Sequence, residues 1–221
     1  MIEQLIFKFK TNKNYIKEDY YVTESNKQAF ETINTWPKWI KRVVNIYGPS
    51  GSGKSHLTSI FSEKVPCYKI SSKNLSNEIF LKFKLKEALI IEDFDNQTSE
   101  ELLYSIFNMV EQDNKYMLIT SKTPISLFNF KLKDLKSRAR SSTIIEIKLP
   151  SDELIKVILA KNFSDKQINI DKKLINYIIK TTDRSYEKIS QFILNLDSYS
   201  LKKGKPISFK IVKEVINMLK T

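Results

Sequence analysis

The feature that most constrains this chain is a glycine-rich loop between a strand-like and a helix-like segment. An apolar run at residues 43–47 precedes the loop, and a helix-like segment at residues 56–64 follows it. Glycines let successive backbone N–H groups turn inward around phosphate oxygens, because a Cβ would block the turn or the approach. Three of the four glycines of the chain lie here, which argues against a chance turn. The pattern predicts a nucleotide-binding P-loop formed by Gly48, Pro49, Ser50, Gly51, Ser52, Gly53, Lys54 and Ser55.

The residues at the end of this loop are suited to phosphate chemistry. Lys54 is positioned to reach the β- and γ-phosphates, and the Ser55 hydroxyl can ligate Mg²⁺. The positive end of the helix that follows points at the same phosphates. The sequence therefore predicts a bound nucleotide with Mg²⁺.

Composition limits the remaining possibilities. With 221 residues, 41% of them hydrophobic, the chain can bury the core of one domain plus a small appendage. No apolar run approaches the length of a membrane span, and the first residues lack the features of a signal peptide. Cys67 is the only cysteine, which excludes a disulfide framework and a thiolate metal site. We therefore expect a cytoplasmic protein without membrane contacts.

The net charge of +12 invites a nucleic-acid interpretation. The lysines are spread along the chain, however, so a solvated lysine-rich surface is the favoured explanation. On this basis DNA would be bound at most weakly or indirectly. Arginine makes planar and bidentate contacts that lysine cannot, so the few arginines matter more. They are Arg42, Arg138, Arg140 and Arg184.

The order of predicted elements indicates an α/β domain followed by a helical one. Strand-like and helix-like runs alternate up to Pro150, which is typical of a parallel sheet covered on both faces. We expect strands at 42–47, 65–70, 87–92, 115–120 and 143–148, and helices near 53–64, 73–83, 98–112 and 134–140, after a first helix that begins at the N-cap Ser25. Four helical segments are expected at 151–163, 170–181, 184–198 and 208–219.

An apolar strand that ends in acids forms a second candidate nucleotide motif. Residues 88–91 are apolar, and Glu92 and Asp93 follow them. Such a strand places one carboxylate beside Mg²⁺ and another beside the attacking water. The motif is weak alone, but it gains specificity because it lies 38 residues after Lys54 with a strand and a helix between.

Together these motifs resemble the AAA+ ATPases of the replication-initiator group. The P-loop run continues into His56-Leu57, and residues 101–108, 118–121 and 134–138 follow in the same order as in the DnaA core. The resemblance extends from about Asp19 to the end of the chain. The fold it implies is an AAA+ domain at 19–150 with a helical lid at 151–221, preceded by a segment at 1–18. DnaA proteins continue into a helix-turn-helix domain whereas this sequence ends at Thr221, so the chain is similar to the Hda-type regulators of alphaproteobacteria.

The resemblance implies roles for particular residues. Arg138 corresponds to an arginine finger that acts on a neighbouring subunit, although it could merely solvate a helix end. Ser121, after Thr120, corresponds to a polar sensor near the γ-phosphate, although both could be ordinary turn residues. Tyr21, with Tyr20 and Val22, corresponds to the adenine contact, although these side chains could be core. His56 is interpreted as a packing residue beside the nucleotide. ADP or ATP is the implied cofactor.

The N-terminal segment resembles the peptide by which Hda-type proteins dock on the DNA sliding clamp. An extended segment with a glutamine and apolar anchors can fill a preformed groove. The alternative is an edge strand packed on its own domain. The residues concerned are Gln4, Leu5, Ile6, Phe7 and Phe9.

Two departures from the family pattern predict a nucleotide holder with weak or no ATPase activity of its own. Glu92 stands where the family usually has the metal-side aspartate, and its extra methylene changes the reach of the carboxylate. Glu187 stands where DnaA has a second sensor arginine. Arg184 lies three residues earlier on the same helix face and could substitute, although an ordinary surface arginine is equally consistent.

The leading hypothesis is a regulator that binds ADP or ATP, docks on the clamp and supplies Arg138 to ATP bound by DnaA. Self-association into a homo-oligomer is possible. The main alternative is a helicase-loader ATPase that binds single-stranded DNA. A small P-loop kinase fits less well, because no acceptor-binding signature is present.

Overall fold

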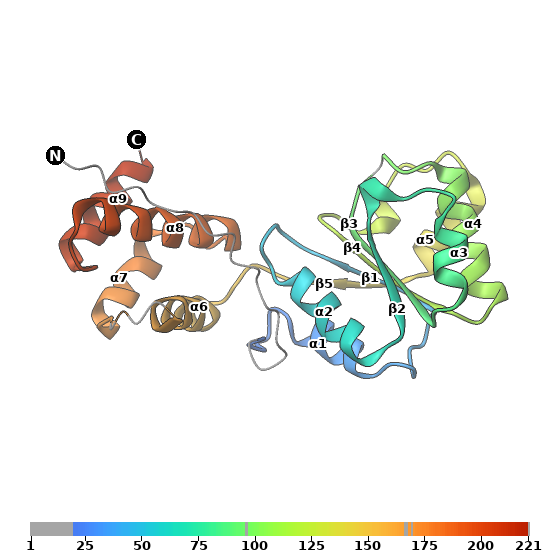
Figure 1. Cartoon of the computed structure of the whole chain (residues 1–221), viewed down its shortest axis with the longest axis horizontal. Coiled ribbons are helices and arrows are strands. Elements are labelled where there is room, and N and C mark those ends of the chain that lie inside the picture. The colour runs from blue at the N-terminus through green and yellow to red at the C-terminus, as the bar shows by residue number, and fades with distance from the viewer. Residues whose placement is uncertain (1–19, 96, 166–167, 169, 221) are drawn as a thin grey trace.

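The computed structural model describes residues 20–220 except 96, 166–167 and 169. A five-stranded parallel sheet forms the larger part, with strand order β2-β3-β4-β1-β5 (Figure 1). This α/β architecture with a helical C-terminal region is the predicted one. No helix of the described chain is long and apolar enough to cross a bilayer.

The strands read as apolar runs because both faces of the sheet are covered. In β3, Leu89 and Ile91 face one core and Ala88 and Ile90 face the other, in the alternation that a strand imposes. The predicted strands all occur, with shifts of one or two residues at their ends. Their bounds are β1 Val43–Tyr47, β2 Cys67–Ser71, β3 Ala88–Phe94, β4 Tyr116–Ser121 and β5 Thr143–Glu146.

Helices cover the two faces unequally. The helices α1 and α2 pack on one face through Ile33 and Phe61, whereas α3, α4 and α5 pack on the other through Phe83, Phe107 and Leu135. The bounds are α1 Lys27–Asn34, α2 Lys54–Lys64, α3 Ile79–Lys84, α4 Glu100–Gln112 and α5 Lys133–Ser141, with short 3₁₀ turns η2 Ser72–Asn74 and η3 Ile125–Leu127.

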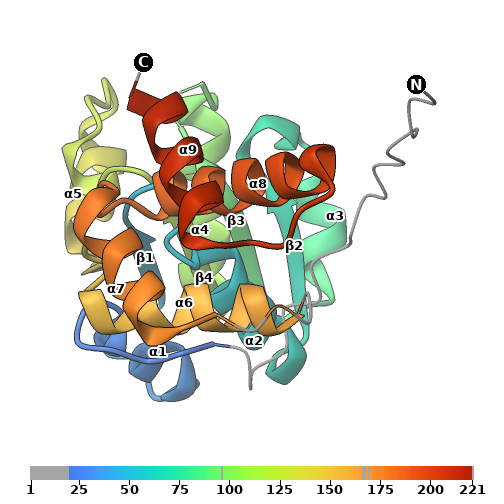
Figure 2. The ribbon, with the colours of Figure 1, turned by 90° about the vertical axis from the view of Figure 1, so that its left-hand side faces the viewer.

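The four C-terminal helices have a core of their own. Side chains such as Leu159, Phe163, Ile178 and Phe192 are buried among themselves and not against the sheet. Figure 2 shows these helices in front of the sheet. Residues 147–151 connect β5 to α6, the first of them. The bounds are α6 Asp152–Asp165, α7 Lys172–Thr181, α8 Tyr186–Lys203 and α9 Phe209–Lys220.

Three predicted helix boundaries were wrong. The N-cap of α1 is Asn26 and not Ser25. The helix expected from residue 73 begins only at Ile79, because residues 72–74 form a separate 3₁₀ turn first. The helix expected to end at residue 198 continues to Lys203, where Gly204 terminates it at a φ of 60°, a left-handed conformation that glycine adopts readily.

Candidate functional site

The glycine-rich loop lies at the carboxyl edge of the sheet, where ligands of open α/β sheets commonly bind. It leaves β1 after Tyr47 and enters α2 at Lys54. The Gly48 N–H donates to the Ser121 carbonyl of β4 at 3.2 Å, which attaches the start of the loop to the neighbouring strand. The loop therefore has a backbone fixed from both sides.

Two glycines of the loop are required by geometry. A Cβ on Gly48 would lie 2.6 Å from the carbonyl oxygen of Ile147, a distance that no packed structure tolerates. Gly53, the N-cap of α2, has a φ of 89°, which side chains disfavour. The close approach of Gly48 to the end of β5 was not evident in the sequence, whereas the turn into α2 was.

Lys54 is buried and makes three contacts with its own loop. Its Nζ donates to the carbonyl oxygens of Gly48 and Pro49, both at 2.8 Å, and to the Ser52 hydroxyl at 3.4 Å. Burial lowers the pKa of the ammonium group, while the Asp93 carboxylate opposes that shift. The positive charge is thus held against the carbonyl oxygens of its own loop.

The Glu92 carboxylate contacts a lysine ammonium group and a threonine hydroxyl. Its Oε1 accepts a hydrogen bond from Thr58 Oγ1 at 2.6 Å and forms an ion pair with Lys69 Nζ at 3.1 Å. Lys69 lies on β2, and its ammonium also donates to the Thr58 hydroxyl at 3.0 Å. The Thr58 hydroxyl also lies 3.0 Å from the Ser55 carbonyl, so Glu92 is attached to the first turns of α2. Neither Lys69 nor Thr58 was singled out in the sequence.

Asp93 lies at an irregularity of β3. The register between β3 and β4 shifts between Ile91 and Phe94, and Asp93 has a φ of 50°. Its N–H donates to Thr120 Oγ1 at 3.1 Å, and its side chain is exposed. A non-glycine residue in this conformation costs of order 1–3 kcal/mol. The bulge turns the Asp93 carboxylate out of the strand on the side of Lys54.

Ser121 is fully buried and takes part in a polar network. Its hydroxyl donates to the Thr123 carbonyl at 2.6 Å and accepts from Asn45 Nδ2 at 2.9 Å. The Asn45 side chain also accepts from the Ile125 N–H at 2.8 Å. The Ser121 hydroxyl therefore acts as both donor and acceptor in holding the end of β4. Of Thr120 and Ser121, Thr120 is the one that contacts β3, where it accepts from the Asp93 N–H.

Tyr20 and Tyr186 close the loop from two sides. A Cβ on Gly53 would lie 3.1 Å from the Tyr20 ring, and one on Gly51 would lie 3.2 Å from Tyr186 Cβ. Both hydroxyl oxygens are buried, and burial raises the pKa of both phenols. Tyr186, the first residue of α8, was missed because a lone tyrosine at a helix start carries no local signal.

The aromatic residues expected beside the nucleotide lie in different surroundings. Tyr20 packs edge-on against His56, with ring centroids 5.1 Å apart, so His56 has the packing contact expected of it. Tyr21 is 51% exposed. Of the two neighbouring tyrosines, Tyr20 is therefore the one that lies against the loop.

Arg184 is paired with a carboxylate at the start of α6. Its Nε lies 3.2 Å from Asp152 Oδ1, and a second nitrogen lies 3.3 Å from Oδ2. Both side chains are largely exposed. Glu187 is also exposed, yet its backbone nitrogen would lie 3.6 Å from a Cβ on Gly51. The first turn of α8 therefore lies against the loop, whereas the Arg184 guanidinium is held by α6.

Arg138 lies near the middle of α5, on the face of the sheet opposite α2. Leu135 of α5 is buried in the core on one face, whereas Phe61 of α2 is buried in the core on the other. The Arg138 guanidinium carbon lies 5.5 Å from the centre of the Tyr104 ring, a cation–π contact. Arg140, two residues on, is exposed.

The predicted clamp-binding segment and the predicted metal site remain predictions. The segment of Gln4, Leu5, Ile6, Phe7 and Phe9 lies outside the described residues. Within the described part, no group of three or more His, Cys, Asp or Glu side chains could hold a metal ion. An Mg²⁺ at Ser55 and Glu92 would therefore need ligands from a nucleotide.

The chain is similar in sequence to known proteins. A sequence profile of the family described as RNA helicase matches residues 44–129, the part that holds the P-loop and the acidic strand. The DnaA replication initiator of Campylobacter jejuni is 28% identical over 231 residues, which is 93% of this chain and 52% of that protein. The chain thus spans about half the length of the curated relatives it matches.

Solved structures agree with the sequence comparison. Domain III of the Thermotoga maritima DnaA superposes with a TM-score of 0.76 at 18% identity, covering 93% of this chain and 97% of that one. The chain has a DnaA-like AAA+ fold. The AMPPCP-bound DnaA from Aquifex aeolicus also matches this DnaA-like domain, with a TM-score of 0.69 at 19% identity over 87% of this chain and 68% of that one. The chain is thus similar in sequence and in fold to replication initiators named DnaA.

Proposed function

We propose that this chain is a regulator of replication initiation that holds an adenine nucleotide and supplies Arg138 to ATP on a DnaA initiator. The observation that carries the proposal is the placement of Arg138 on α5, on the face of the sheet opposite α2, the helix that follows the loop. Arg138 is half-exposed, and its guanidinium packs on the Tyr104 ring of α4. An arginine placed in this way is available to a nucleotide on a neighbouring molecule.

Nucleotide binding is supported by the loop itself. Lys54 and the N-terminus of α2 put positive charge among backbone N–H groups, a suitable environment for phosphates. The Aquifex aeolicus relative is described as AMPPCP-bound, which favours ADP or ATP as the ligand. The aromatic residue nearest the loop is Tyr20, so we assign it the base contact in place of Tyr21.

Mg²⁺ fits this site through few protein ligands. The ion commonly binds one or two carboxylates together with substrate phosphates. Thr58, one turn after Ser55 in α2, donates to Glu92, so the Glu92 carboxylate lies beside the helix that carries Ser55, and we assign both residues to the ion. When bound, Mg²⁺ neutralises charge on the phosphates. In the protein, Lys69 already neutralises Glu92, which supports a nucleotide holder with little ATPase activity of its own.

The wider role rests on homology and on the N-terminal pattern. Homology to DnaA favours a cytoplasmic protein that acts at initiation, with an AAA+ domain at 19–150 and a lid at 151–221. Residues 4–9, within the segment 1–18, would tether it to the sliding clamp. DNA would be contacted indirectly, through the clamp. Self-association would use the same surfaces of the AAA+ domain as the contact with DnaA.

The deciding experiment measures hydrolysis of ATP preloaded on the cognate DnaA in the presence of clamp-loaded DNA. We expect stimulation by the wild-type protein and its loss in Arg138→Ala, because a finger in trans is worth about 10³–10⁵ in rate. Arg140→Ala is the matched control on the same helix and should retain stimulation.

Failure has a defined meaning. If the wild-type protein did not stimulate DnaA, the trans role of Arg138 would be wrong. A rapid ATPase activity of the protein alone, increased by single-stranded DNA, would instead indicate the helicase-loader alternative. Loss of stimulation in both arginine variants would point to a damaged α5.

A further inference from the structure

The strand β5 leaves one edge of the sheet available. It is the last strand in the order and pairs with β1 among the described strands. The Ile147 N–H donates inward to the Tyr47 carbonyl at 2.7 Å, whereas the Lys148 N–H donates outward to the Ser25 carbonyl at 3.0 Å. Because backbone groups alternate along a strand, those of Ile144 and Glu146 also point outward. This edge can accept a further strand.

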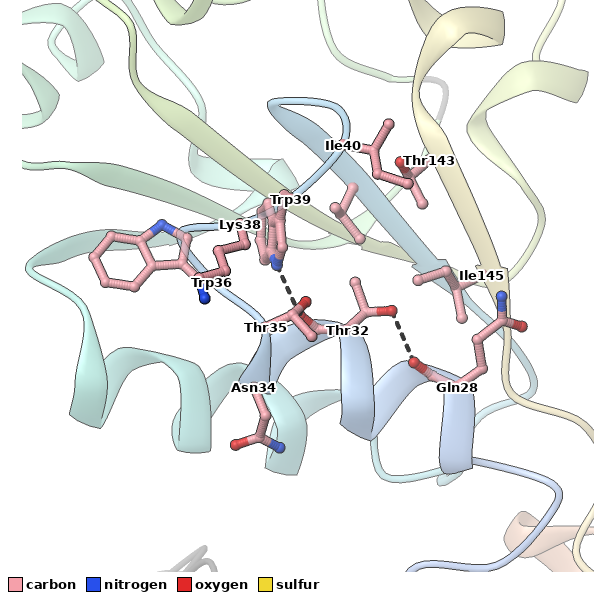
Figure 3. A pocket seen from close by; sticks show the side chains of 11 residues that line it. Gln28, Thr32, Asn34, Thr35, Trp36, Lys38, Trp39, Ile40, Thr143 and Ile145 are labelled. Carbon is pink, nitrogen blue, oxygen red and sulfur yellow. Dashed lines mark hydrogen bonds between the residues drawn. The ribbon is translucent and has the colours of Figure 1, made fainter.

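An open pocket of about 700 Å³ lies beside that edge, between α1 and β5 (Figure 3). Val44 and Ile145 form part of its lining, and both are buried core residues. The Trp39 ring also lines it, and its indole N–H is already donated to the Thr32 carbonyl at 2.7 Å. The Thr32 hydroxyl is likewise used within α1. The pocket is therefore suited to apolar side chains.

The sequence of this chain contains a segment with the matching pattern. Leu5, Phe7 and Phe9 alternate with Ile6 and Lys8, which is the period of a strand with one apolar face. A strand paired with β5 would direct every second side chain to the α1 side of the sheet, where the pocket lies. The other face would meet Glu146, which is exposed and lies on the side opposite Ile145.

The length of chain permits the contact. The described residues begin at Tyr20, whose ring stacks on Phe30 of α1 at 5.6 Å. The ten residues 10–19 can span about 33 Å when extended. The helix α1, which forms one wall of the pocket, is only about 12 Å long. Residues 10–19 are therefore long enough to carry residues 5–9 from Tyr20 to the pocket.

We propose that residues 5–9 of this chain add to the free edge of β5 as a sixth strand, with Leu5, Phe7 and Phe9 in the pocket. Backbone hydrogen bonds to Ile144 and Glu146 supply affinity, and the pocket sets the register. Lys8 on the opposite face meets the Glu146 carboxylate, a favourable cross-strand pair. The inference concerns a site on this chain and goes beyond the proposed function. One corollary rests on that function: β5 and the clamp compete for the same residues.

The two tryptophans of the chain provide the readout, because Trp36 and Trp39 both line the pocket. Indole emission moves to shorter wavelength and is quenched less by acrylamide when water is displaced. We expect the full-length wild-type protein to be quenched at least twofold less than the double variant Phe7→Ser/Phe9→Ser. The variant Ile6→Ser, on the other face of the segment, is the matched control and should behave as wild type. Equal spectra and quenching for the wild type and the double variant would overturn the proposal.

A second variant tests the backbone contact. Glu146→Pro removes one outward N–H from an edge strand, where proline is tolerated, and leaves the bonds to β1 in place. It should increase quenching to the level of the double variant, whereas Glu146→Gln should not. Unchanged quenching in Glu146→Pro would refute strand addition.

The same measurements separate the other possible occupants. Protection that appears only as protein concentration rises, together with dimers in light scattering, would mean that a second copy supplies the segment and would overturn the intramolecular form. The corollary is measured separately, by clamp pull-down with Glu146→Pro, which should bind more strongly than wild type. Absence of clamp binding by every form, with the quenching result intact, would refute the clamp role and leave the β5 contact standing.

Discussion

The nucleotide loop and the helix α5 use polar side chains in different ways. Around the loop, Lys54, Glu92 and Ser121 are each held by two or more partners, and Lys54 and Ser121 are buried. On α5, Arg138 packs on one aromatic ring and is half-exposed. A site that holds its own ligand is preorganised within one chain. A residue meant for a partner must stay accessible, so its partner completes its environment.

The largest expected effect separates the loop from α5 directly. Lys54→Ala should weaken nucleotide binding about 100-fold or more, because it removes the positive charge buried in the loop. Arg138→Ala should leave that affinity unchanged. Isothermal titration with ADP and ATP measures both. A similar loss in both variants would mean that Arg138 contacts the nucleotide of its own chain.

A smaller effect is expected at the contact between α8 and the loop. Tyr186→Ala removes a buried ring from the first turn of α8, the turn that lies against Gly51, and nucleotide should dissociate about tenfold faster because this turn is packed less firmly. The cavity should also cost about 3 kcal/mol of stability. Stopped-flow release of a fluorescent nucleotide gives the rate, with Tyr199→Ala on the same helix as the control. Equal release rates in the two variants would show that α8 does not contribute to retention.

The ion pair at Glu92 predicts a gain of activity. Lys69→Met should raise the ATPase rate of the protein alone several-fold, because Glu92 loses the ammonium that neutralises it. Lys73→Met, on the exposed turn after β2, is the control. Phosphate release under excess ATP and Mg²⁺ is the measurement. A rate unchanged or lowered in Lys69→Met would mean that Lys69 does not restrain Glu92.

The smallest effect concerns the buried phenol of Tyr20. Burial raises its pKa above the unfolded value of 10.0, so above pH 10 the native state keeps a proton that the unfolded state releases. This group therefore makes the free energy of unfolding fall as pH rises beyond 10. Tyr20→Phe should remove that part of the decline, as measured by urea unfolding at pH 9 and pH 10.5. An identical decline in the variant would contradict the assignment.

The sequence predicted the elements well and the contacts between them less well. Local apolar runs identified the strands, since a run such as 88–91 has few alternatives in a parallel sheet. Boundaries failed where a local turn competed, as before α3. The roles of Lys69, Thr58 and Tyr186 could not be predicted, because each meets its partner only after distant segments pack together.

What the sequence determined by itself was the chemistry of the loop. The glycines and Lys54 specify a phosphate-binding turn through backbone conformation and charge, which depend on neighbouring residues alone. The tertiary structure decided which groups surround that turn and which lie far from it. Lys69 reaches Glu92 because β2 pairs with β3, and Arg138 lies across the sheet from α2 because α5 packs on the other face. Such relations depend on strand order and packing, which no single stretch of sequence contains.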